Sequence, residues 1–146
     1  MRVGAALFLM IAVAGCGGPS GPASTDTSSA SLPTLAERVD FLQRYVTFRR
    51  DYRELDFRVV YHNNGGGLVP GPSDWDIRVV AVVPPAELAS WVPAGATAMA
   101  TADVTWLADV PGAERAAGIT EWYVEPGAVV GVDRAASAVA YRRWTQ

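Results

Sequence analysis

Large apolar residues recur three or four positions apart between residues 34 and 50, a spacing typical of one face of an α-helix. Thr34 and Glu37 fit a capping box, in which each side chain accepts a backbone N–H from the other residue. The pattern therefore predicts an amphipathic helix of about four turns that starts at Thr34 and ends between residues 50 and 53. Its apolar stripe consists of Leu35, Val39, Leu42 and Val46, widened by Phe41, Tyr45 and Phe48.

From residue 55 apolar and polar residues alternate, which predicts two strands, 55–61 and 75–82, paired as an antiparallel hairpin. Opposite charges indicate the register, because cross-strand ion pairs stabilise a ladder and like charges destabilise it. We expect Asp56 opposite Arg78 and Arg58 opposite Asp76. The same register pairs apolar residues on the other face, namely Phe57 with Ile77 and Val59 with Trp75.

The rest of the chain predicts a short helix at 85–91 and further strands. Pro85 suits the first turn of a helix, and Glu125-Pro126-Gly127 is a strong turn signal. The expected strands are 102–107 (with Val104 and Trp106 inward), 119–124, 128–132 and 138–144. Together the elements predict an α+β fold: one N-terminal amphipathic helix packed on an antiparallel sheet of about five strands.

Composition limits the classes of function. The chain has 146 residues, which allows one domain, and half of them are hydrophobic, enough for a single core. Twelve basic residues face 15 acidic ones, so the net charge is −3 and no basic footprint for nucleic acid exists. The only cysteine is Cys16, so an internal disulfide is excluded.

The N-terminus has the organisation of an export signal. Arg2 precedes an apolar run from Val3 to Ala14, too short to cross about 30 Å of hydrocarbon as a stable helix. The tetrapeptide Val13-Ala14-Gly15-Cys16 resembles the lipobox of bacterial lipoproteins. In that family the cysteine is lipid-modified and becomes the mature N-terminus.

This resemblance implies a signal peptide at 1–15 and fatty acyl groups such as palmitate on Cys16, which hold an exported chain at a membrane. The location would be the outer face of the cytoplasmic membrane, or the outer membrane if the host has one, because Gly17 replaces the aspartate that retains such lipoproteins at the inner membrane. Residues 16–33, the lipidated cysteine and a Gly-, Pro-, Ser- and Thr-rich stretch, predict a disordered tether spanning roughly 20–25 Å. Residues 34–146 would form the single folded domain.

The long hairpin loop, residues 62–74, is the candidate site. Hairpins usually close in two to five residues, so a longer loop often has a task. Its triple glycine could let backbone N–H groups approach an anion, or could simply supply turns. We predict recognition here, by His62, Asn63, Asn64, Ser73 and Asp74 together with Trp75.

Catalysis by the same region is the weaker hypothesis. His62 is the only histidine, and Ser73 is the one nearby nucleophile it could activate. Asp74 and Asp76 share a strand face roughly 6–7 Å apart, near the separation of glycosidase carboxylates. However, a salt bridge from Arg58 to Asp76 would explain the second carboxylate without catalysis.

These observations predict a membrane-anchored extracytoplasmic lipoprotein with a small binding domain for a protein or cell-envelope partner. Two alternatives stay open: an inhibitor or immunity-type lipoprotein that blocks an envelope enzyme, and a small hydrolase using residues 62–76. We expect no cofactor, no metal site and no nucleic-acid partner. Tryptophan is enriched in binding hot spots, and the segment Tyr141-Arg142-Arg143-Trp144 is the second candidate surface.

Overall fold

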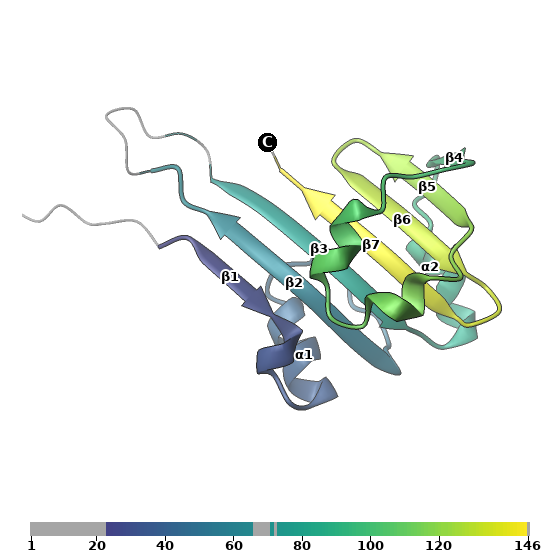
Figure 1. Cartoon of the computed structure of the whole chain (residues 1–146), viewed down its shortest axis with the longest axis horizontal. Coiled ribbons are helices and arrows are strands. Elements are labelled where there is room, and N and C mark those ends of the chain that lie inside the picture. The colour runs from purple at the N-terminus through teal and green to yellow at the C-terminus, as the bar shows by residue number, and fades with distance from the viewer. Residues whose placement is uncertain (1–22, 66–70, 72, 146) are drawn as a thin grey trace, which may run out of the picture.

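A single antiparallel sheet of seven strands dominates the computed structural model, which describes residues 23–65, 71 and 73–145 (Figure 1). The strand order is β1-β2-β3-β7-β6-β5-β4. The mixed α+β character agrees with the sequence prediction, whereas the sheet has more strands than the expected five. The strands are β1 (Thr25–Ser28), β2 (Glu54–His62), β3 (Asp74–Val82), β4 (Thr97–Met99), β5 (Glu121–Glu125), β6 (Ala128–Asp133) and β7 (Ala138–Trp144).

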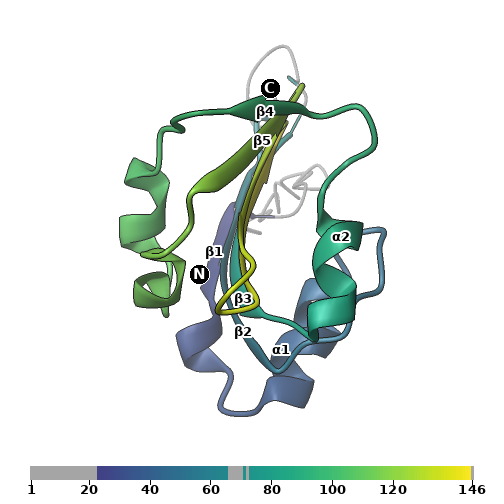
Figure 2. The ribbon, with the colours of Figure 1, turned by 90° about the vertical axis from the view of Figure 1, so that its right-hand side faces the viewer.

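Short helices cover both faces of this sheet. Figure 2 shows α1 (Leu35–Leu42) and α2 (Leu88–Trp91) on one side, and the green 3-10 helices that follow β4 on the other. The 3-10 helices are η1 (Ser29–Ser31), η2 (Pro85–Glu87), η3 (Thr105–Asp109) and η4 (Ala113–Ala116). The expected helix at 85–91 is therefore present as η2 followed directly by α2.

The N-terminal helix begins as predicted but is half the expected length. Thr34 and Glu37 form the complete capping box, with the Glu37 amide donating to Thr34 Oγ1 over 3.2 Å. The helix ends at Leu42, after eight residues. Beyond it the apolar residues still pack inward without helical geometry: the Phe48 ring meets Trp91 edge-on at 5.3 Å between centroids and Tyr141 at 5.7 Å. Tertiary aromatic contacts thus decide the conformation of this segment.

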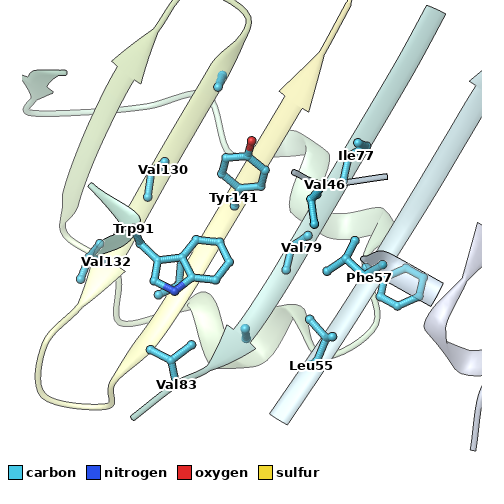
Figure 3. Packing of buried hydrophobic residues seen from close by; sticks show 14 of the residues in the cluster. Val46, Leu55, Phe57, Ile77, Val79, Val83, Trp91, Val130, Val132 and Tyr141 are labelled. Carbon is cyan, nitrogen blue, oxygen red and sulfur yellow. The ribbon is translucent and has the colours of Figure 1, made fainter. Parts of the chain in front are cut away.

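Two separate hydrophobic clusters form the core. On the α1 side, Phe57, Val79 and Val139 are fully buried, and Figure 3 shows Trp91 packed beside Tyr141 and Val132. On the other side, Val80 and Ala140 of the sheet pack against Trp106 of η3. The sheet is therefore buried on both faces, which the sequence prediction of one covered face missed.

The hairpin of β2 and β3 exists, but its predicted register is wrong by two residues. Arg58 lies opposite Arg78, and Asp56 lies opposite Val80. A shift of two preserves the faces, so the inward residues are those expected. The like-charged pair is tolerated because Asp26 of β1 binds Arg58 and Asp109 of η3 contacts both arginines.

Part of the predicted tether is folded, which corrects the expected domain boundary. Residues 25–28 form β1, an edge strand with Thr25 opposite Tyr61 of β2, and η1 follows directly. Ser29 is completely buried and its hydroxyl donates to Asp56 over 2.8 Å. The segment has almost no large apolar side chain, but backbone pairing and this buried hydrogen bond attach it to the sheet.

The predicted strand at 102–107 is wrong as well. Asp103 accepts the backbone N–H and the hydroxyl of Thr105, which starts η3 instead of a strand. Trp106 is buried as expected, with its indole N–H donating to the Asp103 carbonyl over 3.0 Å, while Val104 is exposed. A side chain that caps the local backbone competes effectively with strand pairing.

Candidate functional site

The predicted binding residues gather at one end of the sheet, where β2 ends, β3 and β1 begin, and β7 ends (Figure 1). His62 lies opposite Asp74, and Trp144 lies opposite Asp76. The antiparallel order of β3 and β7 therefore brings the loop candidates and the C-terminal candidate segment together. We call this the loop end of the sheet; the turn 134–137 marks the opposite end.

Hydrogen bonds hold both stems of the 62–74 loop. The Asn63 amide donates to Ser24 Oγ over 2.9 Å, and the Asn64 side-chain amide donates to Asp74 Oδ2 over 2.7 Å. The Gly65 amide returns to Asn63 Oδ1 over 2.8 Å. Residues 66–70 and 72, including most of the glycine and proline run, lie outside the described residues. These hydrogen bonds therefore fix the two ends of the loop to each other and to Ser24, which lies just before β1.

The arrangement of His62 and Ser73 does not support the catalytic hypothesis. The Ser73 hydroxyl accepts a hydrogen bond from the Tyr61 hydroxyl over 2.9 Å, and His62 is exposed. In the described ranges no hydrogen bond joins His62 to Ser73, so the base and the nucleophile are not assembled as a pair.

The carboxylate pair is also accounted for by structure. Asp76 is ion-paired as expected, but with Arg78 and Arg142 rather than Arg58. Burial opposes ionisation of Asp76, yet the hydrogen bonds from Arg142 and Arg78 outweigh it and lower the pKa below the ordinary 3.8. Asp76 is therefore a structural anion between β3 and β7.

A surface groove lies at the loop end, beside the predicted binding residue Trp75. It has a volume of about 410 Å³ and runs between the segment after α1 and the paired ends of β3 and β7. Trp75 forms an aromatic wall, with ring centroids 5.0 Å from Tyr45 and 4.4 Å from Tyr61. The lining residues are Arg44, Tyr45, Thr47, Trp75, Ile77, Arg143, Trp144 and Thr145.

Backbone pairing fixes the wall of the groove in place. The Trp75 amide donates to Thr145 Oγ1 over 2.8 Å, and the Thr145 amide donates to the Trp75 carbonyl over 2.9 Å. Ile77 pairs with Arg143, so Trp75, Ile77 and Arg143 belong to the same face of the sheet. A rigid aromatic surface beside a cation is therefore built into two adjacent strands.

The charge of this groove is positive although the chain is acidic. Among the described residues, two arginines line it and no carboxylate side chain does. Arg44 pairs with Asp40 one helical turn earlier, whereas exposed Arg143 has no acidic partner in the part of the chain that the structure describes. Such a site suits an anionic or zwitterionic group adjoining an apolar one.

The second candidate segment divides between the two faces. Tyr141 is buried, and burial raises the pKa of its hydroxyl. The Arg142 guanidinium lies 5.1 Å from the centre of the Trp144 ring, which packs against the core of the far face. Tyr141 and Arg143 both lie on the Trp75 face, but only Arg143 is exposed there, so the segment contributes one cation rather than an exposed aromatic anchor.

Sequence reasoning proposed Trp75 and residues 141–144 as separate surfaces and missed Arg44, Tyr45 and Thr47. Tyr45 was assigned to the helix stripe, and its position on the groove follows from the early end of α1 at Leu42. The alternation of β3 and β7 could have indicated part of the groove. Once the two strands are paired, Trp75 and Arg143 lie on the same face of the sheet.

Within the described ranges, no group of histidine, cysteine or acidic residues is placed to hold a metal ion. The same ranges contain no helix with the length and apolar character that a membrane span needs. Compared with family models, curated proteins and solved structures, the chain matches none of them.

Proposed function

We propose that this chain is an exported lipoprotein, held at a membrane by lipid on Cys16, whose domain binds a component of the cell envelope through the groove at the loop end. The anchoring rests on residues 1–16, where a basic start and a short apolar run lead to the lipobox-like Val13-Ala14-Gly15-Cys16. One acyl chain anchors marginally, but several chains on one cysteine would anchor stably because every buried methylene adds to the affinity.

The observation that carries the binding function is the groove itself, with aromatic Trp75 and Tyr45 beside the exposed cation Arg143. Aromatic and arginine side chains dominate recognition surfaces, since they bury large areas and keep directional contacts. The domain offers no comparable assembly of a nucleophile and a base among its described residues. Binding therefore accounts for the geometry better than hydrolysis does.

The position of chain entry supports a role close to the membrane. Ser24 is bonded to Asn63 at the loop end, so the eight residues 17–24 connect this end to Cys16. The disordered tether predicted from the sequence would then have an end-to-end distance of roughly 14–17 Å over these eight residues. This is shorter than the 20–25 Å expected for a tether that lasted to residue 33, because β1 belongs to the fold.

Detergent phase partitioning tests the anchor. The wild-type chain should enter the detergent phase, and Cys16→Ser should remain in the aqueous phase. Equal partitioning of the two proteins would refute the anchoring half of the proposal.

Photo-crosslinking tests the site. A photoreactive amino acid at Thr47, in the groove, should capture an envelope component from intact cells, whereas one at exposed Ala135, in the opposite turn, should not. Equal capture from both positions would remove the groove as the binding site. If the captured component is an enzyme that the protein inhibits, the inhibitor alternative becomes the better description.

A further inference from the structure

The two ends of the sheet would lie at different distances from a lipid anchor on Cys16. Residues 17–24 lead from Cys16 to the loop end and can extend at most about 26–29 Å. The nine residues of β2 alone extend about 30 Å towards the other end. An anchored chain can therefore bring the loop end onto the membrane, while the turn 134–137 points away from it.

We propose that the groove docks on the membrane surface and that its ligand is the headgroup region of an anionic phospholipid in the bilayer that holds Cys16. This inference rests on the proposed lipid anchor and names the envelope component that the groove binds. Arg143 contacts the lipid phosphate, while Trp75 and Tyr45 lie at the level of the glycerol backbone.

The chemistry of the lining favours this ligand. Tryptophan and tyrosine concentrate where headgroups meet acyl chains, since each has an apolar ring and a polar atom. Basic side chains near the bilayer are attracted to anionic lipids. The groove combines both features, since the described part of its lining includes two arginines and no acidic side chain.

Acidic groups at the same end do not oppose the contact. Asp74 and Asp76 lie on the sheet face opposite to Trp75, because residues of a strand alternate between faces. Asp74 accepts a hydrogen bond from the Asn64 amide, and Asp76 is neutralised by Arg78 and Arg142. Glu125 shares the sheet face of Arg143 through Ala128, but it does not line the groove.

A single thiol makes the orientation measurable. In the lipidated protein Cys16 would be blocked, so Thr47→Cys or Ala135→Cys would supply the only reactive thiol. Both positions are exposed, so a fluorophore can be attached without entering the core. The labelled full-length lipoproteins are reconstituted in phosphatidylcholine vesicles containing phosphatidylglycerol and a headgroup spin-labelled lipid that quenches nearby fluorophores.

The proposal predicts strong quenching at residue 47 and little at residue 135. Quenching at residue 47 should weaken when phosphatidylglycerol is omitted, and Arg143→Gln should remove most of that dependence. Arg49→Gln, which removes an exposed arginine outside the groove, should leave it unchanged.

Vesicle flotation distinguishes a failure of the proposed lipid anchor from a failure of the proposed membrane docking. If the labelled proteins do not float with vesicles, the lipid anchor fails and the orientation with it. If they float but both labels are quenched equally, or residue 135 more strongly, the anchor stands and membrane docking of the groove is overturned. Quenching at residue 47 that is insensitive to both Arg143→Gln and phosphatidylglycerol overturns the anionic headgroup as its ligand.

Discussion

Removal of the Asp56 carboxylate should strongly destabilise the fold, because this buried group connects several elements to β2. Asp56 lies on β2 with its side chain 7% exposed. One oxygen accepts hydrogen bonds from the Ser29 hydroxyl over 2.8 Å and from Arg38 Nη1 over 2.7 Å. The other oxygen accepts a hydrogen bond from Arg115 Nη1. The carboxylate thereby connects η1, α1 and η4 to the strand.

The expected cost follows from those contacts. Each hydrogen bond to a charged group contributes about 1.5–3 kcal/mol, and Asp56 makes two with arginines and one with a serine. In Asp56→Ala the arginines are partly relieved, since their side chains are 24% and 29% exposed and Arg115 keeps its ion pair with Glu54. We therefore expect a loss of about 3–5 kcal/mol in the free energy of unfolding, the range for breaking a buried ion pair.

Urea unfolding followed by tryptophan fluorescence measures this loss in a Cys16→Ser background. The matched control is Asp40→Ala, which breaks the Asp40–Arg44 pair, where both side chains are more than half exposed. That change should cost only about 0.5 kcal/mol or less. If Asp56→Ala costs no more than Asp40→Ala, Asp56 does not anchor the N-terminal segment and the reasoning is refuted.

Two other predictions concern the same sheet. Gly112→Ala should lower the urea midpoint more than Gly95→Ala. Both glycines have a positive φ (72° and 84°), but only at Gly112 would the new Cβ meet Asp56, 2.7 Å from Oδ2. Equal losses in the two variants would contradict this prediction. The pKa of Asp76 is lower in the folded than in the unfolded chain, so its contribution to stability is complete above about pH 4 and is lost as the pH falls through the folded pKa. The stability difference between wild type and Asp76→Asn should accordingly shrink in urea titrations below about pH 4, and a difference that stays constant would contradict the assignment.

Features that depend on neighbouring residues were predictable from the sequence. The Thr34–Glu37 capping box and the Glu125-Pro126-Gly127 turn both form, the latter with Gly127 at a positive φ of 74°. Alternation also assigned Phe57 to the buried face correctly. Each signal acts within a few residues, so one sequence contains it completely.

The failures share a cause in partners that are distant along the chain. The hairpin register was argued from charges on two strands, whereas Asp26 and Asp109 from other elements bind the arginines of that hairpin. Strand β1 was missed because its stabilisation comes from backbone pairing with β2 and from the Ser29–Asp56 contact rather than from its own apolar residues.

The candidate site shows the same division. Trp75 and the segment 141–144 could be proposed separately from composition and position. Their meeting in one groove depends on β7 pairing with the distant strand β3 as well as with its neighbour β6, and on the end of α1 at Leu42, which places Tyr45 against Trp75. Neither fact is encoded in a local pattern.

The central claim, a lipid anchor that places the groove end at a membrane, is tested most directly by the intact mass and N-terminal peptide of the mature chain extracted from membranes. We expect a chain that begins at Cys16 and carries the added mass of acyl groups on that residue. A mature chain that still begins at Met1, or one that begins at Cys16 with no added mass, would contradict it.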